Sequence, residues 1–288
     1  MKKHVITIRV LVNTLILISL FVSQYARAET SNFASLTAGL DNENGSLFDA
    51  YVDMSLTEIL RISLSAGENT SDTNEGKFTT RQIQTSISGL HTNKNQSAMA
   101  WSIGYRTWGK SNVIETEDSI ISIGYFSPDN WHLSLDYETG QLQLYTRGEF
   151  SKRQKSLKSN RDAWRLSFDH THNGGFAWMS YLQRNYAQNL SLLNERRNAQ
   201  RAINNIALNQ AFALSKEELT LGYEWFLETL DLGVDYNRII SVVDNHRNHY
   251  ASIFTRHYVG NNLTVDLRIE QEINDRFTVF TVGVGYAW

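Results

Sequence analysis

The chain ends in the stretch FTVGVGYAW, residues 280–288, and this stretch decides how the rest of the sequence is interpreted. Every second residue in it is large and apolar: Phe280, Val282, Val284, Tyr286 and Trp288. Successive side chains of a β-strand point to opposite faces, so a period of two predicts a strand with one apolar face. The small or polar residues between them form the opposite face.

The same alternation recurs along the chain. Leu60, Ile62 and Leu64 alternate with Arg61, Ser63 and Ser65. The pattern predicts a protein made of β-strands whose apolar faces often end in tyrosine or tryptophan. Further segments of this kind are 99–106, 131–138, 164–169, 219–225 and 263–270.

The first 28 residues have the features of a secretory signal peptide. Lys2, Lys3 and Arg9 precede an apolar run from Val10 to Val22, and Ala26-Arg27-Ala28 supplies small residues at a cleavage site. The run is shorter than the roughly 20 residues of a membrane-spanning helix. We therefore expect a signal peptide at 1–28 and one mature domain at 29–288.

Composition excludes several other classes. There is no cysteine, so neither a disulfide framework nor a thiolate metal site is possible. Pro128 is the single proline, as suits continuous sheet. Removing the basic signal leaves a chain more acidic than the formal net charge of −3, which argues against a nucleic-acid partner.

With its signal peptide, its repeated alternation and its terminal aromatic strand, the sequence resembles the Gram-negative outer-membrane β-barrel class. That class usually ends in phenylalanine, so Trp288 is a small departure. The resemblance implies an all-β fold: a single transmembrane antiparallel up-and-down barrel in the cell outer membrane, surrounded by lipid and lipopolysaccharide. It also implies that the barrel-assembly machinery reads Phe280, Val282, Val284, Tyr286 and Trp288 during biogenesis.

About 14 strands are expected, with 16 or 12 as alternatives. The first six candidates are 33–40, 46–55, 60–68, 77–90, 97–108 and 117–127. The apolar parity changes near Gly140 and again near Glu228, and each change is either a turn or a β-bulge. Two bulges give fourteen strands, with long hairpins at about 131–170 and 219–258. The fourteen-strand arrangement places 151–161 and 186–203 outside the cell and a short turn at 215–218 on the periplasmic side. It therefore satisfies the rule that periplasmic turns are short and outer loops are long.

If the apolar face meets lipid, the other face lines the lumen. Charges of both signs on that face predict a hydrated interior, because unpaired buried charge is costly. A passive porin-like channel for small hydrophilic solutes, without cofactor or metal, is the favoured function. A closed barrel acting as a surface scaffold or as an export partner, for example for a polysaccharide, stays open. The lumen-lining candidates are Arg61, Arg106, Asp136, Glu138, Arg147, Arg165, Asp169, Glu224, Asp266, Arg268 and Glu270.

Two basic segments lie in predicted outer connections. Arg196, Arg197 and Arg201 would favour anionic solutes if their segment folds into the mouth as a constriction; a solvated surface loop is the alternative. A second basic set could contact lipopolysaccharide phosphates. It consists of Lys152, Arg153, Lys155, Lys158 and Arg161.

An outer-membrane hydrolase with its site at the barrel rim is less favoured. The best-placed histidines are His246 and His249 beside Asp244, while His170 and His172 fall at the predicted periplasmic end. No serine-hydrolase elbow, phosphate loop or metal quartet is present. We therefore expect no enzymatic activity.

Overall fold

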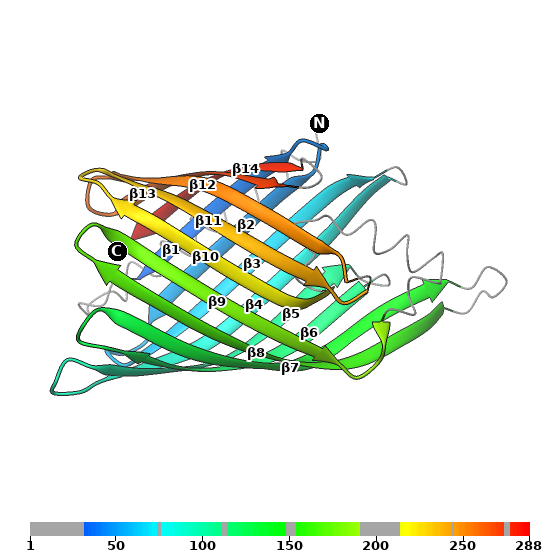
Figure 1. The fold of residues 1–288 in the computed structure, drawn as a ribbon, viewed down its shortest axis with the longest axis horizontal. Helices are drawn as coiled ribbons and strands as arrows, with labels where there is room; N and C mark the ends of the chain where they lie inside the picture. The colour runs from blue at the N-terminus through cyan, green and yellow to red at the C-terminus, as the bar shows by residue number, and fades with distance from the viewer. Residues whose placement is uncertain are drawn as a thin grey trace.

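The computed structural model describes residues 32–73, 76–110, 114–147, 154–190, 214–243, 245–273 and 277–288. The described chain folds into one closed antiparallel barrel of fourteen strands (Figure 1). The strands are β1 (Phe33–Asp41), β2 (Ser46–Ser55), β3 (Leu60–Thr73), β4 (Gly76–Thr92), β5 (Ala98–Lys110), β6 (Ile114–Phe126), β7 (Trp131–Arg147), β8 (Gln154–His172), β9 (Gly175–Tyr186), β10 (Ser215–Phe226), β11 (Leu230–Ser241), β12 (Arg247–Val259), β13 (Leu263–Glu272) and β14 (Thr278–Ala287).

Each strand pairs with the next along the chain, and the barrel closes where β1 pairs with β14 from Phe33↔Ala287 to Asp41↔Val279. The expected up-and-down barrel of 14 strands is therefore confirmed. The predicted signal peptide lies outside the described residues and stays a prediction. None of the helices in the described part of the chain is long and apolar enough to cross a membrane.

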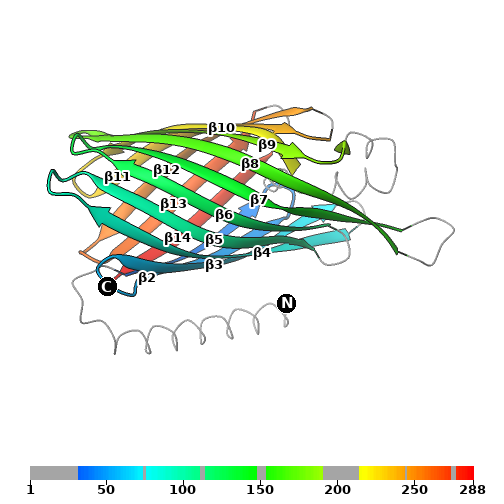
Figure 2. The same ribbon diagram turned by 90° about the horizontal axis from the view of Figure 1, so that it is seen from below.

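The two ends of the barrel differ (Figure 2). Asn32 and Trp288 meet at one end, where each backbone NH donates to the other's carbonyl. At that end the connections are short: 56–59, 93–97, 127–130, 173–174, 227–229 and 260–262. The opposite end carries the 148–153 and 187–214 connections. By the short-turn rule, the end with the termini faces the periplasm. We call it the turn end, and the other the loop end.

The outer face carries an exposed apolar band. At its centre Ile87, Ile103 and Ile121 are cross-strand neighbours on β4, β5 and β6, and the three side chains are 46%, 58% and 53% exposed. Such a row of exposed aliphatic side chains needs lipid around it. Aromatic girdles border the band: Tyr125, Trp131, Tyr223, Trp225, Tyr286 and Trp288 lie toward the turn end, and Tyr105, Tyr137, Trp164, Tyr181 and Tyr236 toward the loop end.

The parity change at Gly140 is neither a turn nor a bulge. β7 pairs with β6 and β8 without a register shift through this residue. Leu142 and Leu144 therefore lie on the inner face, where they are 1% and 3% exposed. On the outer face of β7, the apolar Leu135 and Tyr137 are followed by the polar Gln141 and Gln143, because the strand leaves the lipid there. The prediction of a bulge here was wrong, but that of a long projecting hairpin was right.

The parity change at Glu228 is a turn and not a bulge, so the predicted long hairpin at about 219–258 was wrong. β10 ends at Phe226 and β11 begins at Leu230, with Leu227 NH bonded to the Leu230 carbonyl at 3.1 Å. The predicted periplasmic turn at 215–218 was wrong, because Ser215 begins β10. One turn was thus missed and another wrongly added, so the strand total stayed at fourteen.

The second basic set is not a loop patch. β8 begins at Gln154, so Lys155, Lys158 and Arg161 belong to a strand. Lys158 is exposed, whereas Arg161 is 4% exposed and faces the lumen, where it pairs with Asp118. Arg161 therefore cannot contact lipopolysaccharide. Lys152 and Arg153 lie outside the described residues.

Candidate functional site in the barrel lumen

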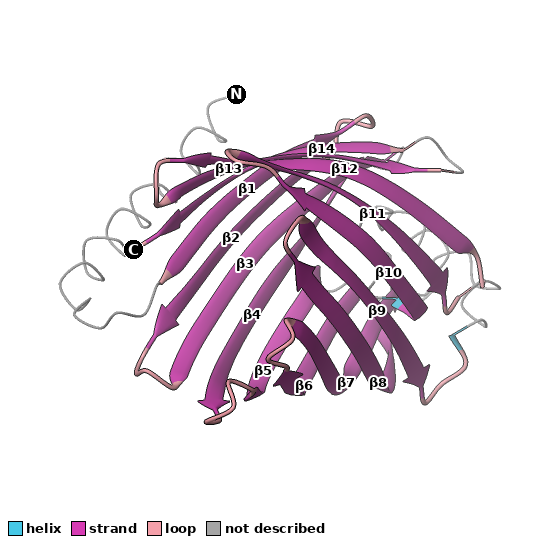
Figure 3. Ribbon diagram, turned by 60° about the vertical axis from the view of Figure 1, so that its left-hand side comes forward, coloured by secondary structure: helices cyan, strands magenta, loops and turns pink. Residues whose placement is uncertain are grey.

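The fourteen strands enclose the barrel interior (Figure 3), and the inner wall has two halves of different chemistry. In the half nearer the turn end, the inner face of β3 to β6 carries mostly small residues, and Ser63 and Ser86 share a hydrogen bond of 2.6 Å across the strand pair. On β7 to β13 it carries most of the large charged and aromatic side chains. Small side chains on one wall leave room for the large groups of the other, so the interior is asymmetric. The small residues are Ser63, Ser65, Ser86, Ser88, Ala100, Ser102, Gly104 and Ser122.

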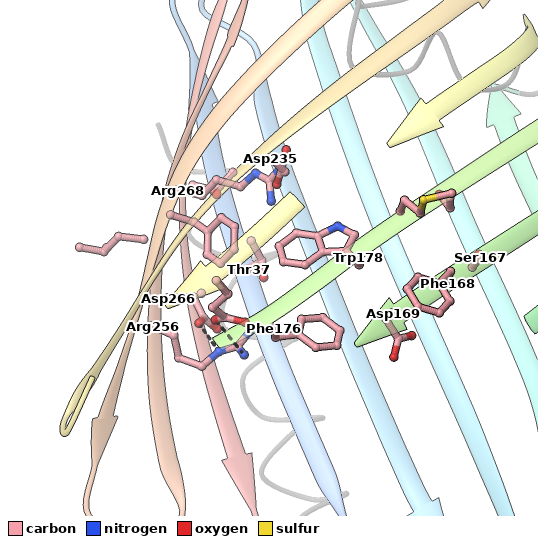
Figure 4. Close-up of a pocket in the computed structure, with 17 residues that line it drawn as sticks. Thr37, Ser167, Phe168, Asp169, Phe176, Trp178, Asp235, Arg256, Asp266 and Arg268 are labelled. Atoms are coloured by element: carbon pink, nitrogen blue, oxygen red, sulfur yellow. Dashed lines mark hydrogen bonds and ion pairs between the residues drawn. The ribbon is translucent and has the colours of Figure 1, made fainter. Parts of the chain in front are cut away.

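A cavity of about 640 Å³ occupies the half of the lumen nearer the turn end (Figure 4). A volume of this size lies within the usual range for small-molecule sites. Its lining comes from strands that are contiguous around the barrel, β8 to β14 and β1. The charged lining residues are Asp169, Glu224, Asp235, Arg256, Asp266 and Arg268.

Most of these charges are paired. Arg256 Nε is 2.8 Å from Asp266 Oδ1, and Arg268 Nη2 is 2.7 Å from Asp235 Oδ2 and 3.3 Å from Glu270 Oε2. Glu224 differs: it is 8% exposed, its Oε1 has no hydrogen-bond donor, and that atom is 3.8 Å from Arg256 Nη1. Carboxylates thus outnumber guanidinium groups in the cavity.

Besides Phe168, three aromatic residues at inner-face positions line this cavity. Phe176 and Trp178 project from β9 on the inner face (Figure 4), and their ring centroids are 5.4 Å apart. The ring centroid of Phe254 on β12 is 6.2 Å from that of Trp178. Glycines on β10 and β11 make the arrangement possible. A Cβ on Gly222 would be 2.0 Å from the Trp178 ring, and one on Gly233 would be 2.0 Å from the Phe254 ring. The rings therefore lie over the glycine backbone.

Closer to the loop end, a belt of alternating arginines and carboxylates crosses the inner face from β5 to β10. Arg161 binds Asp118 through two nitrogens, at 2.8 and 2.5 Å. Asp118 also accepts from Arg106, and Arg106 reaches Glu138 at 2.9 Å. The belt continues from Glu138 to Arg184, Glu218 and Arg165, over 3.1, 3.4 and 3.3 Å.

Four members of the belt are buried, whereas the Arg165 side chain at its end is 32% exposed. The side chains of Arg161 and Arg184 are 3% and 2% exposed, and those of Asp118 and Glu138 are 1% and 6%. Arg184 also donates to Ser215 Oγ at 2.5 Å. Buried charges need such compensation, because each desolvated ion costs several kcal/mol. The belt therefore fixes the geometry of one wall of the lumen.

Between the belt and the loop end lies an apolar cluster. It joins Phe78 on β4 to Val243, which follows β11, and it also contains Leu190 and Leu214 at the two ends of the long 187–214 connection. β4 and β11 are on opposite sides of the fourteen-strand barrel, so the cluster crosses the lumen. Its other buried members are Trp108, Ile114, Leu142 and Leu144.

The predicted lumen residues fall into these layers. Arg106, Glu138 and Arg165 belong to the belt; Asp169, Glu224, Asp266 and Arg268 line the cavity, and Glu270 pairs with Arg268. Asp136 lies on the inner face between Ser122 and Arg165, and Arg61 pairs with Asp53 on the wall of small residues. Arg147 is the last residue of β7, and its side chain lies outside the described residues, as do Arg196, Arg197 and Arg201. In the C-terminal stretch, Phe280, Val282, Val284 and Tyr286 alternate on the outer face of β14, and Trp288 follows the strand.

Several residues of the site were not predicted. Glu218 was expected in a periplasmic turn at 215–218 and Arg161 in a loop, while the sequence offered no prediction for Arg184. An inward aromatic residue such as Trp178 is unexpected in a hydrated barrel. Alternation could have found it, since Trp178 and Ser180 share a face opposite Met179.

Three histidine side chains form side-chain hydrogen bonds with partners among the described residues. His132 Nδ1 is 2.9 Å from Asp169 Oδ2, His172 Nε2 is 2.8 Å from Tyr223 Oη, and His249 Nδ1 is 2.6 Å from Tyr236 Oη. His170 and His172 lie at the turn end, as predicted from the sequence, and Asp244 lies outside the described residues. The described part of the chain contains no cluster of three or more potential metal ligands.

Comparison with known proteins places the fold among outer-membrane barrels. No family model and no curated protein sequence matches the chain. The toluene transporter TodX of Pseudomonas putida matches at 8% identity over 90% of this chain and 90% of that chain, with a TM-score of 0.52. The NanC porin (8% identity, 88% and 98% coverage, TM-score 0.48) and the KdgM porin (9%, 88% and 98%, TM-score 0.41) are more distant. The fold is that of an outer-membrane β-barrel protein.

Proposed function

We propose that this protein is a passive outer-membrane channel for small hydrophilic solutes. The observation that supports the proposal best is the cavity of about 640 Å³ inside the barrel, whose lining carries charges of both signs. Glu224 Oε1 in this lining receives no hydrogen bond, and an incompletely compensated charge is costly without water around it. A fourteen-strand barrel is also wider than the eight-strand size that side chains alone fill.

We further propose that the channel prefers cations. Asp169, Glu224, Asp235 and Asp266 line the cavity against Arg256 and Arg268, and a lining of one net sign raises the local concentration of the opposite ion. In planar bilayers, the refolded protein should give discrete conductance steps. In a KCl gradient its reversal potential should move toward the equilibrium potential of K⁺.

Heat-unfolded protein from the same preparation is the control for the bilayer recording, and it should give no steps. A silent bilayer containing correctly folded protein would contradict the channel. A reversal potential near that of Cl⁻ would contradict the cation preference alone.

One observation favours a second candidate, a closed barrel acting as a surface scaffold or as an export or assembly partner. The apolar cluster crosses the lumen near the loop end and is nearly inaccessible to solvent. The long 187–214 connection contributes Leu190 and Leu214 to this cluster. Removing part of this connection therefore tests whether the barrel is an open channel or a closed barrel.

Replacing residues 189–202 with a short Gly-Ser linker is expected to raise the single-channel conductance. The change removes Leu190, which is 1% exposed in the cluster, together with Arg196, Arg197 and Arg201. If these arginines lie in the mouth, the cation preference should also increase. A control insertion of the same linker between Gly260 and Asn261, at the turn end, should leave the current unchanged. An unchanged current after replacement of 189–202 would end the constriction hypothesis.

We propose no enzymatic role. The defined partners of the histidine side chains in the described residues are a carboxylate, two phenols and a backbone NH, not a serine hydroxyl. Contact with lipopolysaccharide through Lys152, Arg153, Lys155 and Lys158, and recognition of the C-terminal strand by the assembly machinery, also remain proposals.

A further inference from the structure

The aromatic rings in the cavity need an explanation that a general water channel does not supply. Phe176, Trp178 and Phe254 face a polar lumen, although the protein has a lipid-facing surface for apolar side chains. Exposing ring faces to water brings no stability from burial. Gly222 and Gly233 keep the rings flat against the wall, since any larger residue would displace them. Together, Phe176, Trp178 and Phe254 form a shelf of aromatic faces.

The surroundings of this aromatic shelf are acidic. Glu224 lines the same cavity on β10, with a buried carboxylate whose Oε1 receives no hydrogen bond. Asp169 lines it from β8. The guanidinium carbon of Arg268 already lies 5.7 Å from the Phe254 ring centroid, so one ring of the shelf contacts a cation. Ring faces carry negative potential and attract cations, most strongly those that are weakly hydrated.

We propose that this cavity is a binding subsite for organic cations with an apolar surface, such as quaternary ammonium compounds. The shelf contacts the methyl groups, and the carboxylates of Glu224 and Asp169 balance the charge. An anion would meet these carboxylates, and a neutral apolar molecule would gain nothing from them. The inference deepens the proposed channel function by naming the solute class. It rests on that function only for the claim that the bound cation crosses the membrane.

Choline and its uncharged isostere 3,3-dimethylbutan-1-ol form the matched pair of probes, because they share shape and differ in charge. Titration calorimetry of the full refolded protein in nonionic detergent should show saturable choline binding. The isostere should bind at least about tenfold more weakly, as expected for loss of a desolvated cation–π contact. In bilayers, millimolar choline should reduce the K⁺ current of the open channel.

Trp178→Leu and Glu224→Gln are each expected to weaken choline binding by about tenfold. Trp164→Leu is the matched control, since Trp164 is 51% exposed on the outer face, and it should leave the affinity unchanged. Glu224→Gln preserves shape, so it tests the inference even if Trp178→Leu misfolds.

The inference is overturned if choline fails to bind, if the isostere binds equally well, or if both lumen variants keep full affinity. Choline binding to a protein that gives no current would support the subsite while removing the channel. A conducting protein that does not bind choline would support the channel function and contradict the subsite.

Discussion

Arg184→Met is expected to destabilise the folded barrel by about 3–5 kcal/mol, the usual cost of removing one partner from a buried ion pair. The arginine side chain is 2% exposed and contacts Glu138 and Glu218. Methionine fills the space but leaves Glu138 with Arg106 and leaves Glu218 with Arg165 and the Ser215 hydroxyl. Equilibrium unfolding in urea, monitored by tryptophan fluorescence in detergent or lipid vesicles, measures the loss.

Arg81→Met is the matched control. Arg81 forms an ion pair of 3.1 Å with Glu68, but its side chain is 78% exposed, so the loss should stay below about 1 kcal/mol. The double variant Arg184→Met/Glu218→Gln should recover part of the stability, because it removes one uncompensated carboxylate. Equal, small losses from both arginines would show that water reaches the belt and that its charges are not desolvated.

Ile103→Arg is expected to destabilise the membrane-inserted barrel by about 2–4 kcal/mol, the cost measured for arginine on the lipid face near mid-membrane. Ile103 is 58% exposed, and its cross-strand neighbours Ile87 and Ile121 offer no partner to a charge. Unfolding titrations in lipid vesicles give the free energy. The fraction of protein with folded electrophoretic mobility reports assembly.

Ser102→Arg, one residue away, provides the control. Ser102 faces the lumen between Ser88 and Ser122, so the added side chain projects into the interior and not into lipid. Stability should change by less than about 1 kcal/mol, while the cation preference of the current should fall. If the two variants are equally destabilised, the assignment of outer and inner faces is wrong.

Most of the fold could be predicted because the outer face of each strand is dictated by lipid. Leu133, Leu135 and Tyr137 alternate with polar residues, and a period of two leaves little doubt about the strand. The strand boundaries were harder to predict, because they depend on where a strand passes from lipid into water. At Gly140 the outer face of β7 passes from lipid to water, and beyond it the apolar residue Leu142 faces inward. The apolar positions therefore change parity in the sequence, although the strand pairing has no register shift.

The site was less predictable for a different reason. Alternation shows which residues face inward but not which of them meet across the lumen. The belt joins Arg106 on β5 to Glu138 on β7 and Arg184 on β9, and such contacts depend on the relative shift of neighbouring strands. The cavity depends on Gly222 and Gly233, whose role appears only when the rings that cover them are placed.

The β7–β8 hairpin has a consequence for the outside of the cell. Its strands are 17 and 19 residues long, whereas about 9–11 residues cross a membrane. Backbone pairing continues to Arg147↔Gln154. At about 3.4 Å per residue, and allowing for strand tilt, the ladder rises about 15–20 Å above the hydrocarbon. An antibody, a bacteriophage or a neighbouring cell would meet this rigid projection before the mouth of the barrel.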